Sequence, residues 1–197
     1  MRLIGHRDMV RVMERLFRRA DLPLGMSQGF HPKPRMSFPI ALALGIDGLD
    51  EVMEIELARE LTAETLGERL TAHAVPGLSF GRIDILPPGI RANKARVARV
   101  TYQIAVARGQ TDEIARRAAE LASRESAIVQ RPRQSKPIDL LEFLEELKVS
   151  EGVLSMTLRV TPQSNAGPRE VLGELGLADI EREGARLTRT RVELENG

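Results

Sequence analysis

Strict alternation of apolar and polar residues is the feature that most limits how this chain can fold. Over residues 154–160, leucine, methionine and valine alternate with serine, threonine and arginine. Successive side chains of a β-strand point to opposite faces of the sheet, so the pattern predicts a strand with one buried face. Residues 51–58 and 97–107 alternate in the same way and predict two further strands.

Helical segments fall between these strands. Residues 7–20 place methionine, leucine and phenylalanine on one helical face. Thr62 and Thr111 are suitable N-caps for the second and third helices. Pro168 fits the first turn of a fourth helix, and Gly176 fits its C-terminal end.

The order of elements repeats in the two halves of the chain. Three more strands are expected, at residues 2–4, 78–86 and 187–194. We interpret the order of elements in each half as β-α-β-β-α-β. This order predicts an α+β protein of two tandem ferredoxin-like halves, with antiparallel sheets and the helices on one face of each sheet.

The boundary between the halves is expected near Pro87-Pro88-Gly89. The first half then spans residues 1–89 and the second spans 96–197, with a linker at about 87–95. One compact unit is the alternative, because 197 residues suffice for one large domain or two small ones.

Composition excludes several kinds of site. The chain contains no cysteine, so it forms no disulfide, has no cysteine nucleophile and holds no iron–sulfur cluster by its own thiolates. No apolar stretch reaches the roughly 18–20 residues of a membrane span, and no signal peptide is visible. We therefore expect a cytoplasmic protein with no membrane association.

Positive charge is concentrated in the first part of the chain. Residues 1–37 hold eight basic and three acidic side chains, so they carry +5, and the remainder carries −4 of the net +1. Spacings of four, four and three place Arg7, Arg11, Arg15 and Arg18 on one stripe of the first helix. This stripe predicts a site for phosphate groups or for an acidic protein surface. A solvated helix face without a ligand is the alternative.

A second basic feature is the stretch GMSQGFHPKPRMSF at residues 25–38. Its two prolines favour extended backbone at the residues before them, so His31, Lys33 and Arg35 are expected to share one side. Two neutral hydrogen-bonding residues precede these cations, Ser27 and Gln28. The stretch predicts an anion-binding loop, with a stiff connector as the alternative.

The second half contains a comparable stretch, QRPRQSKP at residues 130–137. It follows the expected helix of that half, as the first basic stretch follows the first helix. Its cations are Arg131, Arg133 and Lys136, and we expect them to bind the same kind of anion.

His6, His31 and Asp8 are the candidates for chemistry near the first helix. Two histidines and one aspartate fall short of the roughly four ligands of a closed zinc site, so no metal is expected. A histidine beside arginines can act as a general acid or base in RNA cleavage. Hydrogen bonding in the loop and at the helix start is the alternative, and no residue is assigned as catalytic.

A series of motifs runs along most of the chain, beginning with GHRDMVRV from Gly5 and SQGFHPKPRMSF from Ser27. It continues with LALG, EIEL, KPIDL and PREVL, at residues 42–45, 54–57, 136–140 and 168–172. Together these motifs resemble the bacterial radical SAM-linked family. That family is a domain of unknown function that occurs fused to, or encoded beside, a radical SAM protein.

The resemblance implies a radical SAM enzyme as partner. That partner would hold the iron–sulfur cluster and the S-adenosylmethionine, and no cofactor is expected on this chain. The family usually has Ser-His-Leu-Asp where this chain has Gly-His-Arg-Asp, so His6 and Asp8 match the motif and Arg7 does not. The family loop often has asparagine in place of His31, which argues against His31 as an indispensable catalyst and favours Lys33 and Arg35 as binding residues.

Three functions are compatible with these features. The preferred one is a non-catalytic accessory domain that presents RNA or another anionic ligand to the radical SAM enzyme, with Phe30 or Phe38 stacking on a base. The second is a metal-independent endoribonuclease that uses His6 with Lys33 or Arg35 as the transition-state cation. The third is a purely protein-binding subunit.

Overall fold

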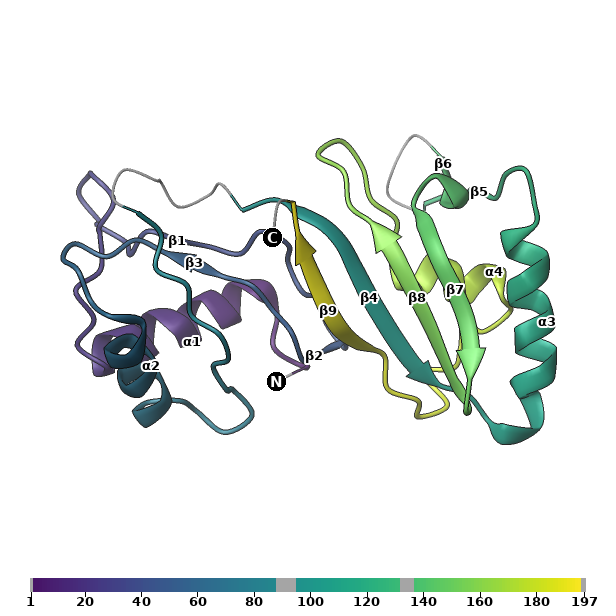
Figure 1. Ribbon diagram of the computed structural model, residues 1–197, viewed down its shortest axis with the longest axis horizontal. Helices are drawn as coiled ribbons and strands as arrows, with labels where there is room; N and C mark the ends of the chain where they lie inside the picture. The colour runs from purple at the N-terminus through teal and green to yellow at the C-terminus, as the bar shows by residue number, and fades with distance from the viewer. Residues whose placement is uncertain (1, 88–94, 132–136, 196–197) are drawn as a thin grey trace. The chain divides into compact units, whose positions relative to one another are not determined.

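The computed structural model describes residues 2–87, 95–131 and 137–195. The chain forms two compact units, unit 1 (Met1–Gly45 and Val52–Arg96) and unit 2 (Ile46–Glu51 and Val97–Gly197). Both units contain helices and strands (Figure 1), so the prediction of an α+β protein is confirmed. The linker expected at about 87–95 lies almost wholly outside the described residues, and the domain boundary there stays a prediction.

Unit 1 begins with a long helix, α1 (His6–Arg19), which buries Met13, Leu16 and Phe17. Two short strands, β1 (Met36–Ser37) and β3 (Glu54–Ile55), form an antiparallel pair. Helix α2 (Ala63–Ala72) starts after Thr62, whose side chain accepts a hydrogen bond from the Thr65 backbone amide. The predicted N-cap at Thr62 is therefore confirmed.

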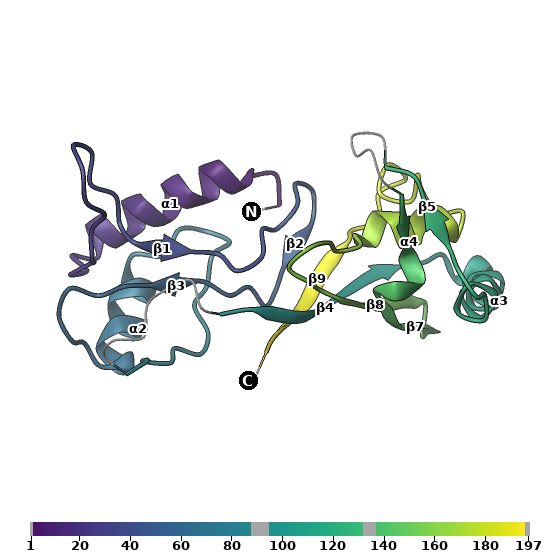
Figure 2. The same cartoon turned by 90° about the horizontal axis from the view of Figure 1, so that it is seen from above.

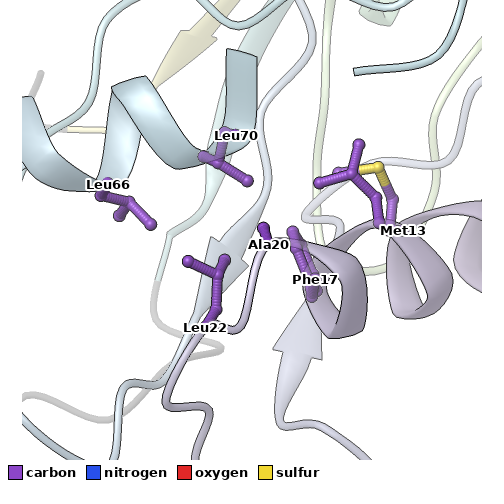
Figure 3. Close-up of a cluster of buried hydrophobic side chains, with 7 residues drawn as sticks. Met13, Phe17, Ala20, Leu22, Leu66 and Leu70 are labelled. Atoms are coloured by element: carbon purple, nitrogen blue, oxygen red, sulfur yellow. The ribbon is translucent and has the colours of Figure 1, made fainter. Parts of the chain in front are cut away.

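The core of unit 1 lies between the two helices and the short strands. Figure 3 shows Leu66 and Leu70 of α2 pointing toward Ala20 and Leu22, which follow α1. Half-buried side chains of β1 and β3 pack against the same cluster, Met36 and Ile55 among them. Apolar contacts rather than an extended sheet therefore hold this unit together.

Two strands predicted for the first half are wrong. Residues 2–4 form a turn, and residues 78–86 have no regular secondary structure. Leu78, Phe80 and Ile83 nevertheless pack against the core, so their alternation reflects burial without pairing of the backbone. The tandem ferredoxin-like arrangement is accordingly not confirmed.

Unit 2 is built on a five-stranded sheet with the order β2-β9-β4-β8-β7. Its strands are β2 (Asp47–Gly48), β4 (Val97–Ala105), β7 (Leu144–Ser150), β8 (Val153–Arg159) and β9 (Thr188–Leu194). Neighbouring strands are antiparallel except β2 and β9, which are parallel. The alternation that predicted β4 and β8 is confirmed, and β7 was not predicted.

Two helices of unit 2 lie on one face of this sheet, α3 (Thr111–Ala122) and α4 (Pro168–Glu174), as Figures 1 and 2 show. The Arg117 guanidinium on α3 donates a hydrogen bond to the Leu175 carbonyl after α4, at 3.1 Å. Pro168 lies in the first turn of α4, and Gly176 follows its end with a positive φ of 72°, both as predicted.

Unit 2 also contains several smaller elements. They are β5 (Ile128–Val129), β6 (Ile138–Asp139), which pairs with β5, and the short 3-10 helices η1 (Arg108–Gln110) and η2 (Leu140–Glu142). In the part of the chain that the structure describes, every helix is too short or too polar to span a lipid bilayer.

A buried ion pair fixes β2 in the sheet of unit 2. Arg189 on β9 is only 1% exposed, and its Nε donates to Glu51 Oε1 at 2.8 Å. Its Nη2 contacts the second oxygen of the same carboxylate. The Asp50 carboxylate also accepts a hydrogen bond from the Val192 backbone amide at 3.1 Å. These bonds hold residues 46–51 against β9.

Replacing Glu51 by alanine is predicted to destabilise unit 2. Arg189 then stays buried without its carboxylate, and we expect the free energy of unfolding to fall by about 3 kcal/mol, because Glu51 itself is partly exposed. Urea unfolding followed by circular dichroism measures the change. Asp179→Ala, which breaks the exposed Arg182–Asp179 pair, is the control and should keep the midpoint of the wild type. Equal midpoints for all three proteins would contradict the prediction.

Candidate anion-binding surface

The arginine stripe of α1 is exposed to solvent. Arg7, Arg11, Arg15 and Arg18 are all exposed, and they span about 16 Å along the helix axis at 1.5 Å per residue. Arg11 forms an ion pair with Asp8, with Nη1 and Oδ1 3.2 Å apart. Among the described residues, no ion pair neutralises the other three guanidinium groups.

The local sequence explains why the arginines remain on the solvent side. Met13, Leu16 and Phe17 turn one face of α1 into the core, so residues spaced by four along the opposite face stay outside. Gly5 provides no side-chain cap, while Asp8 in the first turn and Arg18 in the last turn complement the helix dipole. The result is a helix whose solvent face carries excess positive charge.

The proline-rich stretch folds into a hairpin that follows α1. The Ser27 backbone amide donates to the Lys33 carbonyl at 2.8 Å, and the Arg35 amide donates to the Gly25 carbonyl at 2.8 Å. The Lys33 amide in turn donates to the Ser27 hydroxyl oxygen at 2.9 Å. We call residues 25–35 the hairpin. Its tip is formed by residues 28–32.

The cations of the hairpin have different surroundings. Arg35 donates to both oxygens of Glu56, at 2.9 and 3.2 Å, so its charge is already balanced within unit 1. Lys33 is exposed, and no ion pair of its side chain is seen among the described residues. Gln28 and His31 are exposed at the tip, whereas Ser27 is half-buried and uses its hydroxyl inside the hairpin. Lys33 is therefore the hairpin cation most available to a ligand.

The candidates for chemistry are not brought together. The His6 ring contacts Phe38 edge to face, with the ring centres 5.4 Å apart, and Asp8 pairs with Arg11. In the described part of unit 1, no hydrogen bond, ion pair or ring contact joins His31 to either residue. Within the described ranges, no group of three or more histidines and carboxylates is arranged to hold a metal ion.

The second basic stretch is only partly described. Arg131 has a side chain that is 13% exposed, and its Nε donates to Glu170 Oε1 at 2.5 Å. Its Nη2 also donates to the Asn165 carbonyl. These bonds link Arg131 to α4 and favour a structural role, while its role in anion binding stays a prediction. Arg133 and Lys136 lie outside the described residues.

A buried polar cluster in unit 2, formed by Tyr102, Arg189 and Glu51, was not predicted from the sequence. Tyr102 on β4 is 6% exposed and lies beside Arg189, the partner of Glu51. Burial raises the pKa of the Tyr102 phenol, although the charge and hydrogen bond of Arg189 act in the opposite direction. Burial alone would lower the pKa of Arg189, but the hydrogen bond and charge of Glu51 outweigh this effect and raise it. The cluster keeps its tyrosine neutral and its arginine charged.

The titration of Tyr102 gives a direct test, because the chain has one tyrosine. We expect the phenolate absorbance of the folded protein to rise at a pH above the ordinary tyrosine pKa of 10. The unfolded chain in urea should titrate near 10. The stabilising effect of the neutral phenol is complete below pH 10 and is lost as the pH rises through the folded pKa. Identical titration curves for the folded and unfolded chain would contradict the assignment.

Comparison with known proteins adds the family. Residues 1–168 match a family described as an uncharacterized protein conserved in bacteria (DUF2344). No curated protein and no solved structure matches the chain significantly. The expectation of a bacterial domain of unknown function is thus confirmed, while the link to radical SAM enzymes stays a prediction. Since the match covers 168 of 197 residues, this chain belongs to the bacterial DUF2344 family of uncharacterized proteins.

Proposed function

We propose that the chain is a non-catalytic binding module that holds RNA through the exposed face of α1 and the hairpin. The observation that carries this proposal is the set of exposed guanidinium groups on α1 that no described carboxylate neutralises, those of Arg7, Arg15 and Arg18. Arginine binds phosphate oxygens with two parallel donors, so such a row suits a chain of phosphates.

The distribution of carboxylates supports a polyanionic ligand. No aspartate or glutamate occurs in residues 22–46, which include the whole hairpin. In unit 2, by contrast, several exposed arginines have carboxylate partners, as in the Arg116–Glu113 and Arg124–Glu174 pairs. The unpaired arginines of α1 lie together on one helix face and present a local positive field, which attracts a polyanion from solution.

A radical SAM enzyme is the proposed partner, as the motif resemblance implies. Because this chain has no cysteine, the thiolates of the iron–sulfur cluster and the S-adenosylmethionine site would belong to that enzyme. The chain would then bring RNA to a reaction that takes place on the partner. We propose that this chain and its partner act in the cytoplasm.

We also propose a ferredoxin-like relationship for the second half. Its four long strands follow the order β9-β4-β8-β7, and α3 and α4 lie between them in sequence as in a βαββαβ unit. The first half departs from this pattern, since it lacks strands at residues 2–4 and 78–86. We also propose that the two halves have a tandem origin, and this part of the proposal rests on the order of elements alone.

Binding to a single-stranded RNA oligonucleotide tests the function. We expect affinity that falls as salt rises from about 50 to 200 mM, because counterions are released on binding. The triple variant Arg7→Gln, Arg15→Gln and Arg18→Gln should lower the slope of log K against log salt by about 2, at roughly 0.7 per lost phosphate contact. Fluorescence anisotropy of a labelled oligonucleotide measures both quantities.

A charge-matched control separates the stripe from net charge. The triple variant Arg116→Gln, Arg124→Gln and Arg182→Gln removes three exposed arginines of unit 2 and should leave the slope unchanged. Equal losses in both variants, or no RNA binding at low salt, would refute the proposal. RNA cleavage that disappears in His6→Ala would favour the endoribonuclease, and co-purification with a radical SAM protein without RNA would favour a protein-binding subunit.

A further inference from the structure

The tip of the hairpin presents an aromatic ring entirely to solvent. Phe30 has a relative exposure of 102%, the highest of the described large apolar residues, above Leu3 at 77% and Leu49 at 74%. Exposing a phenyl ring forgoes the stabilisation that its burial would supply. Folding therefore does not account for Phe30 at this position.

The backbone holds the ring at the tip. Gly29, just before Phe30, has a φ of 125°, a conformation that other residues rarely adopt. A Cβ at Gly29 would meet no atom within 4 Å, so its backbone conformation, and not crowding, calls for glycine. Below the tip, the bonds between Ser27 and Lys33 and between Arg35 and Gly25 close the hairpin. The ring is thus carried by an ordered turn.

Phe38 is the other aromatic residue close to this stretch, and its environment differs. It is half-buried against the core of unit 1, and its ring is in contact with His6. Its ring is therefore partly covered by the protein. Phe30 alone of this pair has both faces of its ring open to a ligand.

The neighbours of Phe30 favour a ligand that is both aromatic and anionic. Lys33 and His31 are exposed beside it, and the hairpin contains no carboxylate. The exposed Gln28 amide offers both a donor and an acceptor, which suits the polar edge of a nucleobase. A purely apolar partner would make no use of these polar groups.

We propose that Phe30 is a stacking platform for an unpaired nucleobase, with Lys33 contacting the adjacent phosphate. The inference rests on the proposed RNA binding and narrows it to single-stranded RNA. Bases inside a duplex have both faces covered by their neighbours, whereas an unpaired base can stack on an aromatic side chain.

Affinity measurements on the full chain test this role. Phe30→Ala should weaken binding of a single-stranded oligoadenylate about tenfold, within the range seen when a stacking residue is removed. Binding of an abasic ribose-phosphate oligomer of equal length should be unchanged, since it carries the charge without the bases. Phe30→Tyr should restore the affinity for oligoadenylate. Leu49→Ala, which removes another exposed apolar side chain, is the matched control and should have no effect.

A spectroscopic test uses the absence of tryptophan from the chain. In Phe30→Trp the indole is the sole tryptophan, and its fluorescence should be quenched by oligoadenylate and unaffected by the abasic oligomer. Leu49→Trp should show no quenching by either polymer. Quenching by both polymers in Phe30→Trp would indicate a change in the hairpin and would contradict stacking.

The failures of the two proposals are distinguishable. Suppose that the wild type binds oligoadenylate and that the triple variant of Arg7, Arg15 and Arg18 lowers this affinity. If Phe30→Ala leaves the affinity unchanged, the stacking inference is wrong and RNA binding stands. If Phe30→Ala lowers the affinity for the abasic oligomer as much as that for oligoadenylate, Phe30 stabilises the hairpin and does not stack on a base. If the wild type binds neither polymer at low salt, both proposals fail. Loss of a protein partner in Phe30→Ala with unchanged RNA affinity would instead assign the ring to a protein interface.

Discussion

The pairing of Arg189 with Glu51 is the constraint on which unit 2 depends. A guanidinium group that is 1% exposed has lost its hydration, and a nearby carboxylate must replace it. That carboxylate belongs to residues 46–51, which the chain supplies 138 positions earlier. The parallel pairing of β2 with β9 places this segment beside Arg189. In the same segment, the Asp50 carboxylate accepts a hydrogen bond from the Val192 backbone amide.

Arginine therefore has two different settings in this protein. Arg189 and Arg131 are withdrawn from water and bound by Glu51 and Glu170, so their charge contributes to structure. Arg15 and Arg18 stand on the solvent face of α1, and the described residues supply no counter-charge to them. Whether an arginine is paired depends on where the acidic residues lie. Because few acidic residues lie near α1, a protein of net charge +1 has a local basic surface there.

Sequence patterns correctly predicted the elements that are determined by residues close together in the chain. The alternation of residues 154–160, the N-cap at Thr62 and the placement of Pro168 and Gly176 all correspond to observed structure. Strand β7 was missed because a register shift between Leu144 and Glu146 interrupts its alternation. Residues 78–86 do not pair as a strand, and Phe80 is half-buried by side-chain packing alone. Arg189 offered no sequence signal either, because its carboxylate partner is remote.

The dependence of unit 2 on residues 46–51 has a consequence for biosynthesis. At about 5–20 residues per second, Arg189 is added about 7–28 s after Glu51. During that interval β2 has no partner strand, because β9 has not yet been made. Unit 1 is by then available to fold, and in the sequence residues 46–51 separate its two segments. Completion of the second unit therefore waits for the last strand that the ribosome produces within the described chain.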